Sequence, residues 1–198
     1  MDKKQKTSYT DDMEKNIDFE LKKIDCEQFE EFWQMLTCSF PSDEYRSKDA
    51  HFAMLSNPLH TIFAATDDKD ILGFVTTWDI GNWIYVEHLV TSPHFRNMGL
   101  GSKILQKLES VATLPICLEV EPPVAEMATR RIEFYKRNGY FLNTYRYFQP
   151  PYANDKQPLE LLIMTYPRAI SPAEFEDMKS SLYPIVYNVA KDYEPTSK

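Results

Sequence analysis

The segment HFRNMGLGSKIL, residues 94–105, places the strongest constraint on how this chain folds and what it holds. Gly99 and Gly101 follow Arg96, and an amphipathic helix pattern begins at once. Glycines at the start of a helix let the backbone approach a bulky anion, and the first amides of a helix have no acceptor within it. The helix dipole adds partial positive charge there. The segment therefore predicts either a diphosphate site or a plain strand-to-helix turn.

Two other nucleotide-binding glycine loops do not fit this segment. A Walker A loop has four residues between its glycines, whereas only Leu100 separates Gly99 from Gly101. The dinucleotide fingerprint has a third glycine where this chain has Ile104. The strands before the loop are also expected to form hairpins rather than a βαβ unit, which disfavours dinucleotide binding further.

Hydrophobic periodicity predicts an α+β fold with a mixed, mostly antiparallel central sheet flanked by helices. Apolar runs at 60–66, 70–80 and 83–92 are joined by short turns, so these strands should pair antiparallel. Helical spacing follows at about 99–112 and again at 124–140. The other expected elements are strands at 19–24, 115–121, 140–148 and 158–166 and helices at 25–40 and 41–58.

The length of 198 residues suggests one main domain with appended pieces. Residues 1–16 are polar and predict a flexible tail. Residues 17–166 form the expected domain, and residues 167–198 form a C-terminal helical extension. The extension opens with a capping box, in which Ser171 precedes Glu174 by three residues.

Composition excludes several classes of function. The net charge of −8 argues against a nucleic-acid surface, which is usually basic. The three cysteines form no CxxC pair and the four histidines no HExxH, so no metal site is expected. The widely spaced thiols indicate a reducing, cytoplasmic location. No run of about 18 apolar residues exists and the first 16 residues lack a signal-peptide core, so no membrane association is expected.

Two motifs of the chain belong together. The first is the pattern Arg-x-x-Gly-x-Gly, after a strand ending LVTSP and before an amphipathic helix, and the second is the strand LEVE followed by a helix ending EFYKRNGYF. The first resembles the coenzyme A loop of the GNAT superfamily of N-acetyltransferases, and the second resembles the second half of that fold. The resemblance covers about residues 19–166, and the chain is identified as a bacterial-type member. It implies an N-acetyltransferase that moves an acetyl group from acetyl-CoA to a primary amine of a small molecule or peptide, by direct attack in a ternary complex.

The resemblance also implies which residues bind the co-substrate. The amides expected to hold the pyrophosphate are those of Met98, Gly99, Leu100, Gly101 and Ser102, and the residues that shape their loop are Arg96 and Asn97. The strand residues expected to pair with the pantetheine arm, in a gap beside strand 115–121, are Leu89, Val90 and Thr91. Ala128 stands where many members carry asparagine. Arg131 and its basic neighbours either supply charge to the nucleotide end or form a solvated face.

The chemistry implied needs a base and an acid. Glu87, four residues before Thr91, is the candidate base, with a solvent-facing strand residue as the alternative. Tyr135 matches the superfamily's usual acid for the leaving thiolate, and the alternative is a core residue. Backup bases on the next strand are Glu119 and Glu121. His88 should point to the opposite sheet face from Glu87, because side chains alternate along a strand.

Acceptor specificity is expected from the segments 40–52 and 148–158, which carry acidic and aromatic side chains. The candidates are Asp43, Glu44, Asp49, Tyr45, Tyr147 and Tyr152. The extension after residue 166 either covers the acceptor cleft or forms a homodimer contact. A second hypothesis is a non-catalytic sensor or interaction protein that binds acyl-CoA on the same fold.

Overall fold

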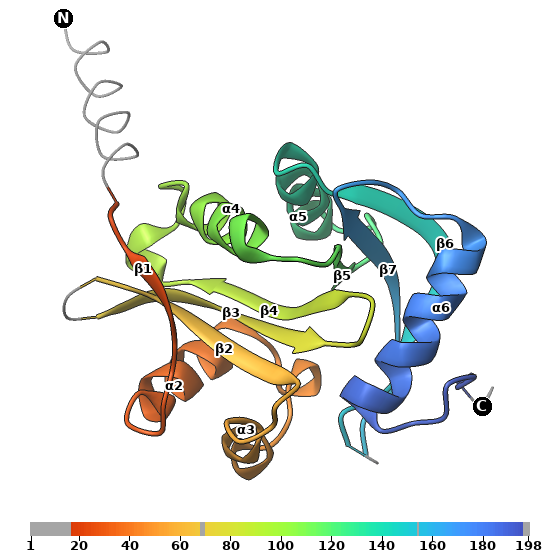
Figure 1. Ribbon diagram of the computed structural model, residues 1–198, viewed down its shortest axis with the longest axis horizontal. Helices are drawn as coiled ribbons and strands as arrows, with labels where there is room; N and C mark the ends of the chain where they lie inside the picture. Colours follow the sequence, from red (N-terminus) through yellow and green to blue (C-terminus); the bar gives the residue numbers. More distant parts are fainter. Residues whose placement is uncertain (1–16, 68–69, 154, 196–198) are drawn as a thin grey trace, which may run out of the picture.

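The computed structural model describes residues 17–67, 70–153 and 155–195, so the predicted tail at 1–16 lies outside it. The described chain forms one seven-stranded sheet with the order β1-β2-β3-β4-β5-β7-β6 (Figure 1). Its strands are β1 (Glu20–Lys23), β2 (His60–Thr66), β3 (Ile71–Asp79), β4 (Ile84–Thr91), β5 (Ile116–Val120), β6 (Phe141–Gln149) and β7 (Leu159–Tyr166). The predicted mixed, mostly antiparallel sheet is confirmed, because β4 and β5 form its one parallel pair.

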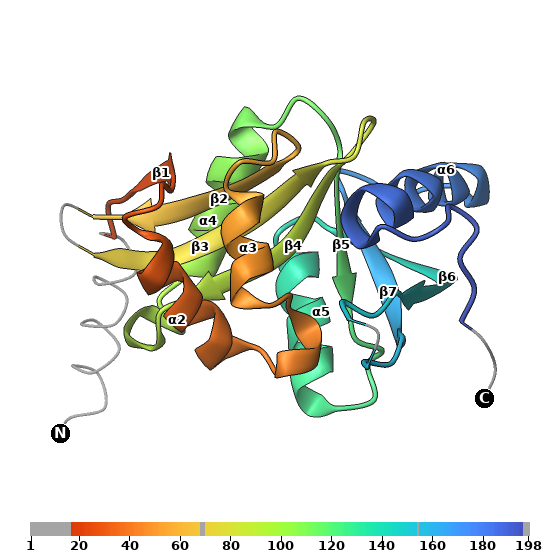
Figure 2. The same cartoon turned by 90° about the horizontal axis from the view of Figure 1, so that it is seen from below.

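Helices cover both faces of the sheet. The α-helices are α2 (Phe29–Ser39), α3 (Lys48–Met54), α4 (Leu100–Val111), α5 (Glu126–Arg137) and α6 (Pro172–Leu182). The apolar stripes of α4 and α5 pack on one face. α2 and α3 lie over the opposite face of the N-terminal half, and α6 packs beside them on the C-terminal strands (Figure 2). None of these described helices combines the length and apolar character of a membrane span.

The parallel pairing of β4 and β5 is short. It runs from Ile84 opposite Ile116 to Val86 opposite Leu118, after which β4 continues to Thr91 without a partner on that side. β5 turns instead toward β7, with which it pairs along its whole length. The two strands therefore diverge at the middle of the sheet and leave a gap between their carboxyl ends.

The sequence correctly predicted the helix after the glycine loop, the helix before Gly139 and the Ser171 capping box. The continuous helix predicted for 41–58 is wrong. Residues Ser42–Glu44 form a 3₁₀ turn, and Tyr45 then has extended backbone angles. α3 begins only at Lys48, because Ser47 provides the cap by accepting a hydrogen bond from the Ala50 amide at 3.3 Å.

Gly73 allows β3, β4 and α4 to pack closely. A Cβ there would lie 2.5 Å from the carbonyl oxygen of Val90 and 3.1 Å from Ile104 on α4. We expect Gly73→Ala to lower the free energy of unfolding by about 3 kcal/mol, because the clash is with backbone and the strand must shift. Gly81→Ala is the matched control: it adds strain at a φ of +92° without a clash, and should cost only about 1 kcal/mol. Urea unfolding measures both, and equal losses would contradict the close-packing argument.

Candidate functional site

The glycine loop presents free amides. Asn97 and Gly99 adopt left-handed backbone angles, with φ of 62° and 76°, and Gly99 is the N-cap of α4. The first hydrogen bond of the helix runs from the Lys103 amide to the Gly99 carbonyl at 3.1 Å. In the described part of the chain, no acceptor is found for the amides of Leu100, Gly101 and Ser102. These amides and the helix dipole together favour an anion at this point.

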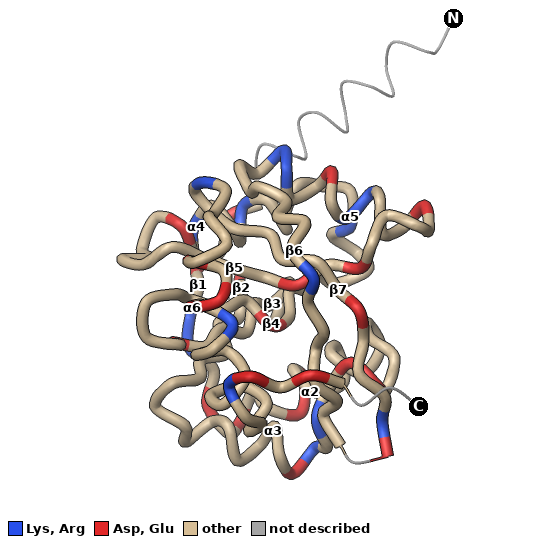
Figure 3. Tube along the Cα trace, turned by 90° about the vertical axis from the view of Figure 1, so that its right-hand side faces the viewer, with Lys and Arg blue, Asp and Glu red and all other residues tan. Residues whose placement is uncertain are grey.

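A cavity lies outside these amides, between the start of α4 and the side of α5. Gly101 borders this cavity. A side chain at this position would crowd the ring of Phe134, because its Cβ would lie only 3.3 Å away, and the glycine keeps that space open. Arg96 and Arg131 line the same cavity. Figure 3 shows basic positions on α5, the helix that forms the far wall. The cavity thus combines unpaired amides with positive charge, as an anionic group of several phosphates requires.

The gap between β4 and β5 opens into this cavity. The residues that line both spaces are Leu89, Thr91, Arg96, Arg131 and Tyr135. Val86 and Leu118, the last residues paired between the strands, lie at the inner end of the gap. Because β4 lacks a partner here, its edge faces the gap and offers backbone groups to an extended ligand.

Glu87 occupies a β-bulge at the inner end of the gap. Thr77 of β3 pairs with Val86 and Thr76 pairs with His88, so Glu87 has no partner residue on β3. It has none on β5 either, since that pairing ends at Val86. The side chain of Glu87 is fully buried while the residue keeps accessible area, so the exposed part is backbone. The bulge therefore turns one stretch of backbone toward the gap.

A second cavity adjoins the gap and is bordered by Phe40 at the end of α2, Ala128 of α5 and Tyr152 of the β6–β7 loop. We call it the acidic cleft, and its volume is about 370 Å³. It shares Phe40, Glu87, Glu119 and Arg131 with the gap. The acidic residues that border it are Glu44, Glu87, Glu119, Glu121 and Glu160. The cavity beside the glycine loop, which we call the loop cavity, the gap and the acidic cleft thus adjoin one another in that order, because each shares lining residues with the next.

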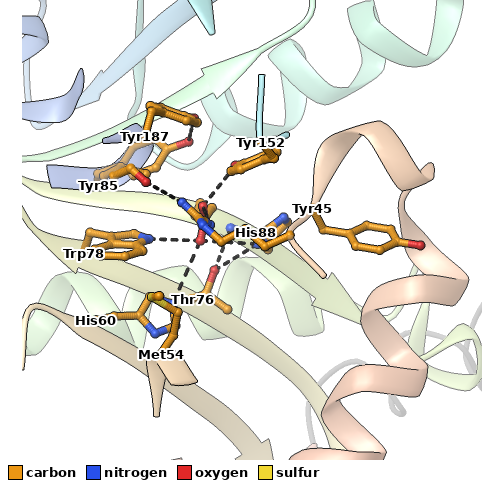
Figure 4. A network of polar contacts seen from close by, with 12 residues as sticks. Tyr45, Met54, His60, Thr76, Trp78, Tyr85, His88, Tyr152 and Tyr187 are labelled. Atoms are coloured by element: carbon orange, nitrogen blue, oxygen red, sulfur yellow. Dashed lines mark hydrogen bonds and ion pairs between the residues drawn. The ribbon is translucent and has the colours of Figure 1, made fainter. Parts of the chain in front are cut away.

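Glu87 lies in a buried ion pair with Arg46. Its carboxylate also accepts hydrogen bonds from Trp78 Nε1 at 2.9 Å and from the Tyr152 hydroxyl at 3.0 Å. Figure 4 shows Trp78 and Tyr152 turned toward a common centre from β3 and from the β6–β7 loop. Burial alone would raise the pKa of Glu87, but Arg46 and the nearby histidines outweigh it and hold that pKa well below its usual range. Glu87 is therefore a poor proton acceptor at neutral pH.

His88 does not point away from Glu87, so that prediction is wrong. Its Nδ1 lies 3.8 Å from Glu87 Oε2, because the bulge removes the alternation of side chains at this point. His88 also contacts the hydroxyl of Thr76 at 3.2 Å and the carbonyl of Glu44 at 3.0 Å. Burial lowers its pKa, which leaves it a neutral structural residue at pH 7.

Glu119 lies in a different environment within the same acidic cleft. Tyr147 donates to its carboxylate, as does Gln149 Nε2 at 2.5 Å. Tyr187, from the C-terminal extension, lies 3.0 Å from each of its oxygens. Burial raises the pKa of Glu119 to about 7, against the opposing effect of these hydrogen bonds. In contrast to Glu87, no cation forms an ion pair with Glu119 among the described residues.

Tyr135 lies on the buried stripe of α5 and borders the gap. Its ring packs against Phe134 and Tyr140, with centroid distances of 5.1 and 5.6 Å. Burial raises its pKa to about 12, with Arg131 acting in the opposite direction. The hydroxyl is therefore protonated at neutral pH and available to donate.

The residues predicted for acceptor binding are only partly brought together. Glu44 and Tyr152 line the acidic cleft, whereas Asp43 and Asp49 are exposed outside its lining. Tyr45 packs edge-on against Trp33 instead. Tyr147 contacts Glu119 from within the core. Sequence reasoning missed Arg46, Gln149 and Tyr187, since no motif marks them and only the tertiary fold brings them to the carboxylates.

Known proteins share this architecture. The model of the acetyltransferase (GNAT) family matches residues 27–140, which is more than half of the chain. The chain belongs to the GNAT acetyltransferase family. A GNAT-family protein of Bacteroides thetaiotaomicron is 34% identical, with a TM-score of 0.80 over 86% of this chain and 99% of that one. The resemblance of the two motifs is thereby confirmed.

Two further comparisons bear on this GNAT chain. YjbC of Bacillus subtilis is 33% identical over 112 residues, which are 55% of this chain and 56% of YjbC. The chain thus spans about half the length of this curated relative. The structure of yncA from Salmonella typhimurium with its cofactor acetyl-CoA has a TM-score of 0.56 at 11% identity, over 78% of this chain and 96% of that one. At that identity the likeness concerns the fold.

A buried histidine beside the site makes stability depend on pH. His51 is fully buried, and neither ring nitrogen has a hydrogen-bond partner in the described structure. Burial lowers its pKa from 6.5 to about 3, against an opposing effect of Glu87. As the pH falls below 6.5, His51 is protonated in the unfolded chain but stays neutral in the folded chain. Acidification therefore favours unfolding.

Between pH 7 and pH 5, we expect the free energy of unfolding to fall by about 1–2 kcal/mol less in His51→Leu than in the wild type, because the variant lacks the buried imidazole. Urea unfolding at both pH values measures the difference. His94→Leu, at an exposed position, is the matched control and should follow the wild type. Parallel behaviour of His51→Leu and the wild type would contradict a neutral buried His51.

Proposed function

We propose that this protein transfers an acetyl group from acetyl-CoA to a primary amine of a small molecule or peptide, by direct attack in a ternary complex. The observation that carries the proposal is the row of three adjoining cavities at the glycine loop, in the gap and at the acidic cleft. Glu119, whose pKa is about 7, borders the point where gap and cleft meet. Membership of the GNAT family supports acetyl transfer as the reaction.

The loop cavity has the features that the diphosphate of coenzyme A needs. The free amides of Leu100, Gly101 and Ser102 would hold the diphosphate, with Met98, Gly99 and Asn97 setting the loop and Arg96 and Arg131 adding charge. The unpaired edge of β4 at Leu89, Val90 and Thr91 would pair with the amides of the pantetheine arm. When bound, acetyl-CoA supplies the reactive thioester, and the yncA structure supports this choice of co-substrate on the same fold.

Glu119 is the best-placed proton acceptor. An amine with a lysine-like pKa of about 10.4 is protonated in water and must lose a proton before it attacks. A carboxylate with a pKa near the working pH accepts that proton most effectively. The pKa of Glu119 is raised to about 7, whereas that of Glu87 is held low by Arg46. The base role predicted for Glu87 stays a prediction, and the opposite environments of the two carboxylates favour Glu119.

Two other groups complete the chemistry. The exposed backbone at the Glu87 bulge would lie against the oxygen that becomes negative as the tetrahedral intermediate forms. Tyr135 is protonated at neutral pH and borders the gap, so it is suited to donate its proton to the departing thiolate. The acidic lining of the cleft would attract a protonated amine.

We expect Glu119→Gln to reduce kcat by roughly 10²–10⁴-fold while acetyl-CoA binding persists, because an amide cannot accept the proton of the amine. Release of free thiol from acetyl-CoA over a panel of primary amines and basic peptides measures turnover, and calorimetry measures binding. Glu176→Gln, an exposed carboxylate on α6, is the matched control and should leave kcat unchanged. Unchanged turnover in Glu119→Gln would remove the base assignment.

We expect the wild type to bind acetyl-CoA, and the double variant R96A/G99A to bind it at least tenfold more weakly, because it loses a cation and strains the loop. The matched control R146A/G81A removes an arginine and a left-handed glycine away from these three cavities and should bind normally. Calorimetric titration with acetyl-CoA, and with NAD and ATP as comparison ligands, measures this. Binding without turnover of any amine would favour the acyl-CoA sensor instead.

A further inference from the structure

The C-terminal extension reaches the proposed base, although it lies outside the segment that the GNAT family model matches. α6 is anchored over β5, β7 and β6 by buried apolar residues, which include Phe175, Met178 and Leu182. A π-helical turn, Tyr183–Tyr187, follows at once and ends at Asn188, which has left-handed backbone angles. The extension thus packs against the face of the sheet through buried apolar side chains (Figure 1).

The π-helical turn contacts both buried carboxylate systems. The carbonyl of Val186 accepts a hydrogen bond from the guanidinium of Arg46 at 2.6 Å, and Arg46 is the ion-pair partner of Glu87. One residue later, the hydroxyl of Tyr187 lies 3.0 Å from both oxygens of Glu119. These contacts connect Val186, through Arg46, to Glu87 and connect Tyr187 to Glu119, two of the acidic residues that border the cleft.

The hydroxyl of Tyr187 is itself held in place. Tyr85 of β4 lies 3.0 Å from it, oxygen to oxygen, and Gln149 of β6 donates to it at 3.1 Å. Its ring packs against that of Tyr152, with the centroids 5.3 Å apart. A side chain that is held by three separate segments, two of them at its hydroxyl, loses little freedom when it donates to a carboxylate, so its hydrogen bond to Glu119 is preorganised.

We propose that Tyr187 is a positioning residue for Glu119: the extension supplies its hydroxyl to orient the carboxylate toward the gap and to stabilise the charged form of the base. This inference rests on the proposed function only in treating Glu119 as the catalytic base. The contact itself, and its effect on the ionisation of Glu119, are independent of whether the protein turns over an amine.

The groups around Glu119 set the direction of the effect. Tyr147 and Gln149 face it from β6, Tyr85 from β4, Cys117 lies two residues before it on β5, and Tyr187 faces it from the extension. Glu87, the ion-pair partner of Arg46, borders the same acidic cleft. Loss of one donor to the charged form destabilises that form, so the pKa of Glu119 should rise when the Tyr187 hydroxyl is removed.

The test is a pH titration of glutamate carboxyl carbons by NMR in the full-length protein. The signal of Glu119 is assigned by its loss in Glu119→Gln. Tyr187→Phe should raise the midpoint of that signal by roughly half a unit to one unit, the effect of one hydrogen bond. Tyr183→Phe is the matched control, because it removes a hydroxyl from the same turn that donates to the carbonyl of Phe148 at 2.9 Å. It should leave the midpoint of Glu119 unchanged.

An unchanged midpoint in Tyr187→Phe, or an equal shift in both variants, would overturn the proposal. A second measurement uses the wild type and so does not depend on whether a variant folds. The Cζ signal of Tyr187 should change with pH at the same midpoint as Glu119. A signal that does not change with pH would overturn the contact. If the protein acetylates an amine, the rising limb of its kcat/KM pH profile should move upward in Tyr187→Phe by the same amount. Absence of turnover would count against the proposed function alone, since the NMR midpoints do not depend on it.

Discussion

A buried ion pair between Arg46 and Glu87 joins segments that are far apart in the sequence. Arg46 precedes α3, Glu87 lies on the bulge of β4, and Trp78 and Tyr152 contact the pair from β3 and from the β6–β7 loop. The carbonyl of Val186, in the extension, accepts a further hydrogen bond from the guanidinium of Arg46. A buried charge without its partner is strongly destabilising, so each of these segments is held where the pair stays satisfied. The walls of the acidic cleft are fixed by the same requirement.

The ion pair also separates the roles of two carboxylates that share one cleft. Glu87 is compensated by a cation and stays charged, whereas Glu119 is surrounded by neutral donors and has a pKa raised to about 7 by burial. Identical side chains on neighbouring strands thus differ in proton affinity because their surroundings differ. The first holds the cleft together, and the second is suited to exchange a proton at neutral pH.

The divergence of β4 from β5 provides the third feature of the site. Parallel pairing ends at Val86 and Leu118, and beyond it the edge of β4 has no partner. An unpaired strand edge inside a protein is costly unless a ligand or water satisfies it. Here the gap leads from the free amides of α4 to the acidic cleft. The divergence of the two strands thus leaves an unpaired strand edge between the free amides of α4 and the acidic cleft.

The sequence by itself determined the glycine loop, the helices that follow it and precede Gly139, and the antiparallel strands, because these depend on local periodicity and backbone preference. Its resemblance to the GNAT superfamily also implied Glu87 as the base, with Glu119 and Glu121 as backups, and Tyr135 as the acid. Only the tertiary structure decided their surroundings. The bulge turned His88 toward its neighbour Glu87, and the extension carried Tyr187 to Glu119, a contact across 68 residues of sequence that no local pattern encodes. Proton affinity depends on such long-range neighbours, which is why the roles of the carboxylates emerged only from the fold.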